Sequence, residues 1–302
     1  MKPIRLALSG SGFKFPAHVG ALMAVRDAGY TPIEFAGTSG GSIVAALAAA
    51  DVPLDWMQRQ TLERDWSDML TFSPWSLLTN MGYCSGGALL DWLREFTGRV
   101  TFAELPRRLT IMASEVGSAM AYAFSRDNTP DCEIALAARA SAAIPFAYAP
   151  VQRRGAFLMD GGMVNNIPAD KLTVDDVPRL GVQLVSTQPP MAAGVHTFVS
   201  MIPRLLNLML SANENTHVSL SRQMGACISF VETGYASGLD RNMPAQIRER
   251  LMFDGYTAVA ASLLTMEAEA AERARTAPAG CAIGTMAATL GAAEPASALQ
   301  PV

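Results

Sequence analysis

Three stretches of the sequence carry residue types that could perform acyl transfer together. The first is a Gly-x-Ser-x-Gly pattern centred on Ser39, whose hydroxyl could act as a nucleophile. The second is the glycine-rich stretch 9–12, whose backbone N–H groups could hold an oxyanion. The third is Asp160, an acid followed by two glycines, which could accept a proton. The sequence therefore contains candidates for a nucleophile, a general base and an oxyanion site.

The elements expected around Ser39 fit a nucleophile elbow. An apolar strand is predicted over 33–36, and an Ala-rich helix is predicted up to Ala50. Gly37 and Gly41 would allow the tight turn between them, because side chains at these positions would meet the strand or the helix. The N–H groups and the dipole of a helix N-terminus favour negative charge beside the serine oxygen. The alternative is a solvated serine in a glycine-rich turn, since so short a pattern is weak alone.

The glycine-rich stretch is predicted to join a strand over 4–8 to a helix over 17–28. It does not fit a dinucleotide site, because Phe15 stands where the third glycine of Gly-x-Gly-x-x-Gly should fall. A Walker loop is also excluded, since no Gly-Lys-Ser/Thr follows. An oxyanion hole is the better functional interpretation, and a tight turn that binds nothing is the structural alternative.

The order strand, helix, strand, helix over residues 4–50 predicts a parallel sheet with helices on both faces. Both loops would then emerge at the carboxyl edge of adjacent strands, where open α/β sheets place their sites. Asp160 ends a short predicted strand over 156–159 and is expected to reach across the same edge. The alternative for Asp160 is plain turn chemistry, since Asp-Gly is a common turn dipeptide.

The remaining elements complete an α/β chain. Further strands are predicted over 109–114, 120–124 and 179–185, and helices over 134–143 and 244–275. From residue 276 the composition becomes Ala, Gly, Pro, Thr and Ser, so we expect one domain over 1–275 and a disordered tail over 276–302.

Two apolar regions could either pack in the core or contact an apolar substrate. All four tryptophans, Trp56, Trp66, Trp75 and Trp92, fall within residues 51–100, a helical region that could form a lid or a surface for apolar substrate. Residues 198–210 are apolar and contain methionine, and could form a second adaptable wall. Core packing is the favoured interpretation for both regions.

Composition bounds the class of protein and its partners. Half of the 302 residues are hydrophobic and 17% are charged, which is typical of a globular protein. The net charge of −4 and the absence of a basic run argue against nucleic acid as a partner. Four scattered cysteines suggest neither a disulfide framework nor a zinc site. Without a predicted signal peptide or membrane span, we expect a cytoplasmic or peripheral membrane protein, with export by an uncleaved route left open.

With these stretches in view, the chain resembles the patatin-like phospholipases. The matching blocks are LALSGSGFKFPAHVGAL at 6–22, GTSGGS at 37–42, and ASAAIPFAYAPV at 140–151 leading to DGGMVNNIP at 160–168. They occur in the family's order and span about half of the chain. Jointly they are highly specific.

The resemblance implies a three-layer α/β/α sandwich with a mostly parallel central sheet. It further implies a dyad of Ser39 as nucleophile and Asp160 as general base, with no metal or other cofactor. The implied oxyanion hole consists of the amides of Gly10, Ser11, Gly12 and Phe13, and the implied motif glycines are Gly37, Gly41, Gly161 and Gly162. The family's loop is usually richer in glycine and has Arg-Gly where this chain has Lys14-Phe15, so Ser11 and Lys14 depart from the pattern.

A histidine base is the alternative to the dyad. Of the three histidines, His18 falls inside the first predicted helix, where local packing is the better interpretation. His196 and His217 lie in or next to the apolar segment after Pro189-Pro190, and the sequence leaves both open as bases.

The implied activity is lipid acyl hydrolysis: cleavage of ester-linked fatty acids from glycerophospholipids through an acyl-enzyme, of phospholipase A or lysophospholipase type. A thioesterase or acyltransferase would use the same acyl-enzyme, and a non-catalytic lipid-binding module is the alternative from another class. The expected partner is a phospholipid or a membrane surface. An activator and the oligomeric state are left open.

Overall fold

The structure is a computed structural model that describes residues 1–69, 82–186, 201, 204, 208 and 214–276. It divides into one compact unit over Met1–Met266 and a second over Glu267–Val302. Among the sequence predictions, Trp75, His196, most of the apolar segment 198–210 and nearly all of the tail 276–302 lie outside the described residues. The predicted division into a domain over 1–275 and a disordered tail stays a prediction.

The described residues form an eight-stranded sheet with the order β10-β9-β1-β2-β4-β8-β7, and β5 lies off this path and pairs with β4 along Thr110–Glu115. β10, β9, β1, β2 and β4 run parallel, whereas β5, β8 and β7 join through antiparallel pairs. The strands are β1 (Lys2–Leu8), β2 (Tyr30–Thr38), β4 (Arg108–Glu115), β5 (Met120–Ser125), β7 (Val151–Arg153), β8 (Ala156–Asp160), β9 (Arg179–Val185) and β10 (Cys227–Glu232). A separate two-stranded sheet pairs β3 (Gly82–Cys84) with β6 (Phe146–Tyr148).

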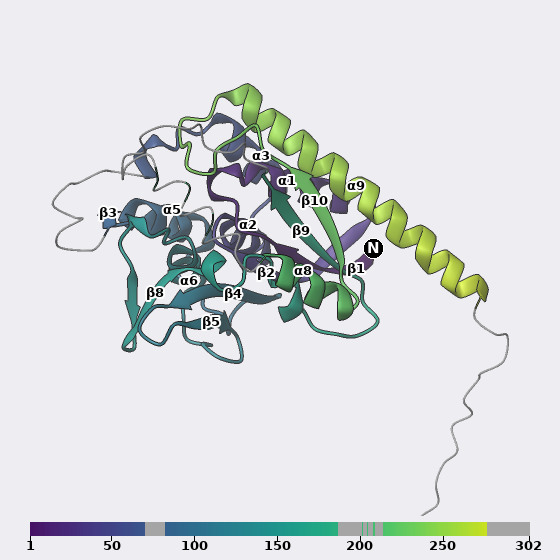
Figure 1. Cartoon of the computed structure of the whole chain (residues 1–302), viewed down its shortest axis with the longest axis horizontal. Helices are drawn as coiled ribbons and strands as arrows, with labels where there is room; N and C mark the ends of the chain where they lie inside the picture. The colour runs from purple at the N-terminus through teal and green to yellow at the C-terminus, as the bar shows by residue number, and fades with distance from the viewer. Residues whose placement is uncertain (70–81, 187–200, 202–203, 205–207, 209–213, 277–302) are drawn as a thin grey trace, which may run out of the picture. The chain divides into compact units, whose positions relative to one another are not determined.

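Helices cover the main sheet and supply its loops (Figure 1). The helices are α1 (Pro16–Asp27), α2 (Gly40–Ala49), α3 (Leu54–Glu63), α5 (Gly87–Thr97), α6 (Ile134–Ser141), α8 (Glu214–Gln223) and α9 (Ala245–Thr276). Short 3-10 turns are η1 (Gly12–Lys14), η2 (Ser67–Met69), η3 (Gly161–Met163) and η4 (Pro168–Lys171). α2 packs on β1, β2 and β4, and α6 packs on β4 and β8. The site loops therefore connect elements that are fixed by packing.

Alternation along the central strands divides the core into two layers. Leu6, Leu8 and Phe35 belong to the large cluster that holds the apolar sides of α1, α2, α5 and α6. Ala7 and Ala36 point to the other face, into a smaller cluster with residues of η4, α8 and β10. Because successive side chains of a strand face opposite ways, one sheet serves both layers. The predicted three-layer α/β fold with a mostly parallel sheet is confirmed.

The predicted secondary structure also matches the described elements closely. The strand, loop and helix units over 4–50, the strands over 109–114, 120–124 and 179–185, and the helices over 134–143 and 244–275 all appear within a few residues of their expected bounds. β3, β6, β7, β10 and α8 were not predicted. Three of these strands contain only three residues, and α8 is largely polar, so neither offers a sustained periodic pattern.

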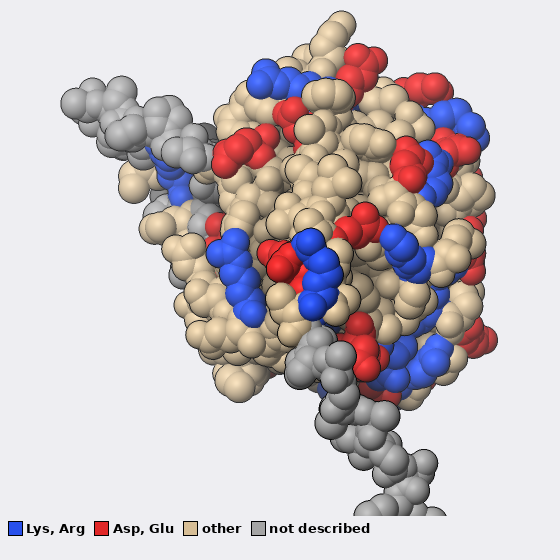
Figure 2. All heavy atoms as spheres, turned by 90° about the vertical axis from the view of Figure 1, so that its right-hand side faces the viewer, with Lys and Arg blue, Asp and Glu red and all other residues tan. Residues whose placement is uncertain are grey.

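Charges of both signs are interspersed on the face drawn in Figure 2, where Lys and Arg side chains lie among Asp and Glu side chains. Exposed ion pairs in the described residues include that of Arg26 with Asp55, whose closest N and O atoms are 3.0 Å apart. Across the described part of the chain, we find no helix with the length and apolar character that crossing a bilayer requires.

Candidate active site

Ser39 stands at the turn between β2 and α2 in a strained backbone conformation. Its φ of 50° and ψ of −126° lie where a non-glycine residue is rarely found, and such strain persists only when the surroundings enforce it. Here the Ser39 N–H donates to Ser141 Oγ at 2.8 Å, and the Ser39 carbonyl accepts from the Ser42 hydroxyl at 2.6 Å. This is the geometry of a nucleophile elbow.

The glycines beside Ser39 are required by close backbone contacts. A Cβ on Gly41 would lie 2.3 Å from the Ser9 carbonyl oxygen, and a Cβ on Gly37 would lie 2.7 Å from Ser42 Cα. Backbone atoms cannot retreat from such contacts without moving a strand or a helix. The steric reason for Gly37 and Gly41 is therefore the one expected from the sequence.

The Ser39 hydroxyl donates a hydrogen bond of 2.7 Å to Asp160 Oδ2. Asp160 is fully buried, and its other carboxylate oxygen, Oδ1, accepts from the Gly162 N–H at 2.8 Å. The Asp160 backbone is also fixed, because its carbonyl accepts from Ser114 Oγ at 2.7 Å. Asp160 therefore both stabilises the turn that follows it and contacts Ser39, because Oδ1 accepts the turn hydrogen bond and Oδ2 accepts the one from the serine.

Strand register brings Asp160 level with Ser39. Thr38 of β2 pairs with Met112 of β4, and β8 continues along the same edge of β4 where β2 ends, with Ala113 paired to Asp160. The other edge of β4 is occupied by β5. The sequence did not predict the direction of β8, which runs antiparallel to β4. The carboxyl edge of the parallel strands is still where Asp160 ends. Asp160 reaches that edge from the opposite direction and stops in register with the serine.

Burial raises the pKa of Asp160 from 3.8 to about 6, because a carboxylate in an apolar interior loses its hydration. The hydrogen bonds from Ser39 and Gly162 stabilise the ionised form and oppose this rise. A carboxyl group with a pKa near 6 is ionised at neutral pH and is still basic enough to take a proton from a bound hydroxyl.

The described histidines are engaged elsewhere. His18 is fully buried, its Nε2 lies 2.8 Å from the Ser9 carbonyl oxygen, and burial lowers its pKa to about 4. Nε2 of His217 lies 2.8 Å from the carbonyl oxygen of Val164. Local packing of His18 is confirmed. Within the described residues, the side-chain partner of the Ser39 hydroxyl is Asp160.

The glycine-rich loop after β1 lies against the elbow, and two of its amides are already used. The Gly10 N–H donates to the Asn166 carbonyl at 3.0 Å, and the Phe13 N–H donates to the Gly238 carbonyl at 2.9 Å. Four amides, from Gly10 to Phe13, were expected to be free to bind an oxyanion. The N–H groups of Gly10 and Phe13 are not free, because each donates to a backbone carbonyl of another loop. Ser11 is buried and its hydroxyl contacts the Gly12 carbonyl at 3.2 Å.

Two other residues with amides not engaged in this way line the cavity beside Ser39. Gly12 and Gly40 both line this cavity, and their N–H groups have no hydrogen-bond acceptor in the part of the chain that the structure describes. Gly40 is the first residue of α2, where a helix leaves its N–H groups unpaired. A Cβ on Gly40 would lie 2.5 Å from the Gly12 carbonyl oxygen, so the loop and the helix start are in direct contact.

Lys14 points away from the cavity. Its ammonium donates to Thr233 Oγ1 at 2.9 Å, and burial lowers its pKa to about 8. Glu214 opposes this shift by its charge and itself accepts a hydrogen bond of 2.7 Å from Asn166 Nδ2. The positive charge expected near the site thus belongs to a buried polar cluster behind the loop.

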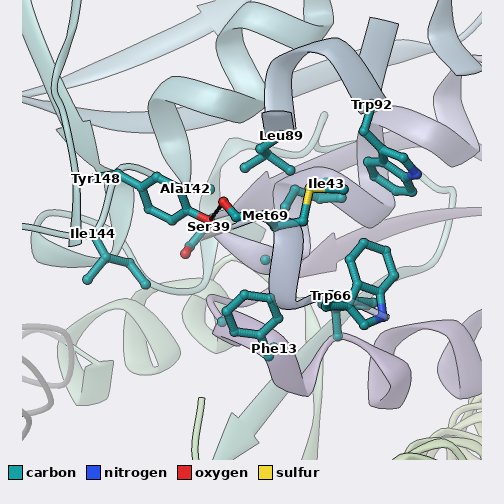
Figure 3. Close-up of a pocket in the computed structure, with 13 residues that line it drawn as sticks. Phe13, Ser39, Ile43, Trp66, Met69, Leu89, Trp92, Ala142, Ile144 and Tyr148 are labelled. Carbon is teal, nitrogen blue, oxygen red and sulfur yellow. Dashed lines mark hydrogen bonds between the residues drawn. The ribbon is translucent and has the colours of Figure 1, made fainter. Parts of the chain in front are cut away.

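An apolar cavity opens beside Ser39 (Figure 3). It spans about 480 Å³ of space between atoms, open solvent included, and its walls are formed mainly by Phe13, Ile43, Met69, Leu89, Trp92 and Tyr148. The Tyr148 hydroxyl donates to the Met69 carbonyl at 3.2 Å and is therefore not free to bind substrate. A pocket with one reactive oxygen and apolar walls suits a hydrocarbon chain.

Sequence reasoning missed several residues that hold the site. Ser141 lies within the 140–151 block, yet a serine in an Ala-rich helix gives no signal that it will accept the Ser39 N–H. Asn166 and Gly238 are far in sequence from the loop that they hold. Among the described residues, no three His, Cys, Asp or Glu side chains gather closely enough to hold a metal ion.

Comparison with known proteins places this geometry in a family. The sequence profile of the patatin-like phospholipases matches residues 6–173, more than half of the chain. The chain belongs to the patatin-like phospholipase family. An uncharacterized NTE family protein of Mycobacterium tuberculosis is 30% identical over 170 residues, which cover 55% of this chain and 44% of the relative. The chain thus spans less than half the length of this relative.

Three further matches bear on the family and the fold. A probable lipid hydrolase of invertebrate iridescent virus 6 is 33% identical over 82 residues, covering 26% of this chain and 28% of the relative. The crystal structure of VipD from Legionella pneumophila superposes with a TM-score of 0.56 at 15% identity, covering 87% of this chain and 67% of VipD. The type III effector ExoU gives 0.53 at 16% identity, covering 88% of this chain and 54% of ExoU. These structures share the fold.

Proposed function

We propose that the protein is a lipid acyl hydrolase that releases ester-linked fatty acids from glycerophospholipids. The observation that carries this proposal is the 2.7 Å hydrogen bond from Ser39 to the buried carboxylate of Asp160, at the wall of an apolar cavity. A hydroxyl paired with a base gives the nucleophile, and the apolar walls favour an acyl chain over a polar substrate.

In the first half of the reaction, Ser39 Oγ attacks the ester carbonyl as its proton passes to Asp160 Oδ2. The new Oγ–C bond gives a tetrahedral intermediate with negative charge on the former carbonyl oxygen. We assign its stabilisation to the N–H groups of Gly12 and Gly40, two residues that line the cavity. When the intermediate collapses, the C–O bond to the alcohol breaks and the Asp160 proton goes to the leaving oxygen.

In the second half, water attacks the acyl-enzyme. Asp160 takes a proton from the water as its oxygen bonds to the acyl carbon, and the proton returns to Ser39 as the Oγ–C bond breaks. The products are a free fatty acid and the original enzyme. Asp160 therefore serves as base and then as acid in each half of the reaction, and its raised pKa suits both directions of transfer.

The test measures fatty acid release from mixed phospholipid vesicles by the wild type, Ser39→Ala and Asp160→Asn. Matched controls make the same substitutions at exposed positions, Ser118→Ala and Asp176→Asn. We expect release by the wild type and both controls, and a loss of about 100-fold or more without the base or the nucleophile. Release by Ser39→Ala at the wild-type rate would refute the assignment.

If the wild type releases no fatty acid, labelling with a serine-reactive fluorophosphonate probe tests whether Ser39 is a reactive nucleophile. Labelling that disappears in Ser39→Ala would keep the nucleophile and reject the phospholipid substrate or point to a missing activator. Unlabelled wild type would reject the enzyme itself and favour a lipid-binding module. ExoU has been crystallised with SpcU, so a second protein is a sensible addition to this arm of the test.

A further inference from the structure

A second apolar cavity lies directly behind the first. It is narrow, spanning about 250 Å³ of space between atoms with open solvent included. It is lined mainly by residues of α1, α2 and α3, among them Val19, Val44, Leu47 and Met57. Four residues line both cavities: Phe15, Ile43, Trp66 and Trp92. These shared residues are the wall between the two spaces.

Trp66 is the centre of this wall. Its ring meets the Phe15 ring edge-on, with centroids 4.9 Å apart and planes at 79°, and meets the Trp92 ring in the same way at 5.2 Å and 78°. Figure 3 shows Trp66 and Trp92 at the end of the first cavity that lies away from Ile144 and Tyr148. An acyl chain that leaves Ser39 in this direction would end at these indoles.

Packing, rather than hydrogen bonding, fixes Trp66. Its Nε1 is buried and has no hydrogen-bond partner among the described residues. The guanidinium of Arg64 lies over the indole, 5.5 Å from its ring centroid. Replacing Trp66 therefore leaves no donor or acceptor unpaired, and the main result is a gap between two apolar spaces.

We propose that Trp66 sets the longest acyl chain that the protein accepts, by closing the passage from the cavity beside Ser39 to the second cavity. This inference rests on the proposed function, because it takes the occupant to be the acyl chain of the substrate. The second cavity is apolar over most of its wall. A hydrocarbon chain that enters it therefore gains the same favourable free energy of transfer from water as in a protein core.

The expected effect is a shift in chain-length preference. Each methylene moved from water into an apolar site contributes roughly 0.8 kcal/mol, about a fourfold change in kcat/KM. In Trp66→Ala, chains two or three methylenes beyond the wild-type optimum should therefore gain roughly tenfold or more relative to the wild type. Short chains, which end before Trp66, should change little.

The experiment compares kcat/KM for p-nitrophenyl esters from butanoate to hexadecanoate. We expect the optimum of Trp66→Ala to move to longer chains and that of Trp66→Leu to move less. The matched control is Trp56→Ala, since Trp56 lines only the second cavity and its loss leaves the wall closed. In the Trp66→Ala background, Leu47→Phe should refill the second cavity and restore the original optimum.

A folded, active Trp66→Ala protein with the wild-type optimum would overturn the inference, and so would an equal shift in Trp56→Ala. If Trp66→Ala fails to fold, the Trp66→Leu series decides by the same criterion. Titration of fatty acids into Ser39→Ala, with and without Trp66→Ala, tests the wall without catalysis. If Trp66→Ala leaves the dependence of Kd on fatty acid length unchanged, the proposed role of Trp66 is rejected. If Trp66→Ala shifts that dependence but the wild type hydrolyses no ester, only the proposed function is rejected.

Discussion

Replacing Asp160 by Asn tests whether the buried charge of the Asp160 carboxylate destabilises the folded protein. The carboxylate of Asp160 is fully buried, with a hydrogen bond to each oxygen, from Ser39 and from Gly162. Asn has nearly the same shape and no charge. The substitution therefore removes the ionisation while it leaves the packing of β8 in place.

The magnitude follows from the pKa of Asp160, which burial raises from 3.8 to about 6. A shift of one unit corresponds to about 1.4 kcal/mol, so this shift of about two units corresponds to about 3 kcal/mol. Because the folded-state pKa is the higher one, the protein binds a proton more tightly when folded. The associated stability is fully present below pH 3.8 and is lost as the pH rises through about 6.

The assay is urea unfolding of the wild type and Asp160→Asn at a series of pH values. We expect the difference in unfolding free energy to change by about 3 kcal/mol in favour of the Asn variant between pH 3.8 and neutrality. Other carboxyl groups titrate in both proteins and cancel in the difference. A constant offset with no pH dependence would instead reflect only altered hydrogen bonding.

The same pKa predicts the acid limb of activity. If Asp160 is the base, kcat/KM of the wild type should rise with pH through about 6, as the carboxyl loses its proton. A stability difference that stays flat from acid to neutral pH would refute the reasoning about burial. An acid limb near the ordinary pKa of 3.8 would refute it from the kinetic side.

Two further substitutions test the supports of the dyad. Gly161→Ala should destabilise the protein by at least about 2 kcal/mol in thermal or urea unfolding, because the new Cβ would lie 2.1 Å from the Met112 carbonyl oxygen. The control is Gly87→Ala, which should be nearly neutral because its Cβ would lie 3.5 Å from the nearest neighbouring atom. Ser141→Ala should leave the Ser39 N–H without its acceptor and lower kcat by roughly tenfold with little change in KM, corresponding to about 1–3 kcal/mol. A raised KM with an unchanged kcat would contradict a role of Ser141 in positioning the nucleophile.

The apolar cavity shows where sequence reasoning stops. The tryptophans of residues 51–100 could be interpreted as a lid or as core, with core favoured. Trp66 and Trp92 are each 5% exposed, so they are core, yet both also line the cavity beside Ser39. Composition cannot separate these roles, because a buried aromatic ring can pack on one edge and bound an empty space on another.

The oxyanion loop gives a second example. By sequence, every amide from Gly10 to Phe13 is an equal candidate donor. In the structure, the Phe13 amide donates to Gly238, a residue from a distant loop, and Gly40 from the helix start lines the cavity with no acceptor for its amide among the described residues. Which N–H groups stay free depends on contacts between distant segments, and no local pattern encodes those contacts.

The sequence by itself determined the local geometry: a strand, a glycine-framed turn and a helix around Ser39, and an acid with two glycines at Asp160. These follow from steric and hydrogen-bonding rules that act over a few residues. Only the tertiary structure decided that Asp160 meets the serine from an antiparallel strand, through the register of Ala113 with Asp160. It also decided which amides are engaged and that Trp66 lines the cavity beside Ser39. The physical reason is that strand register and side-chain packing are collective, since each depends on the placement of all neighbouring elements at once.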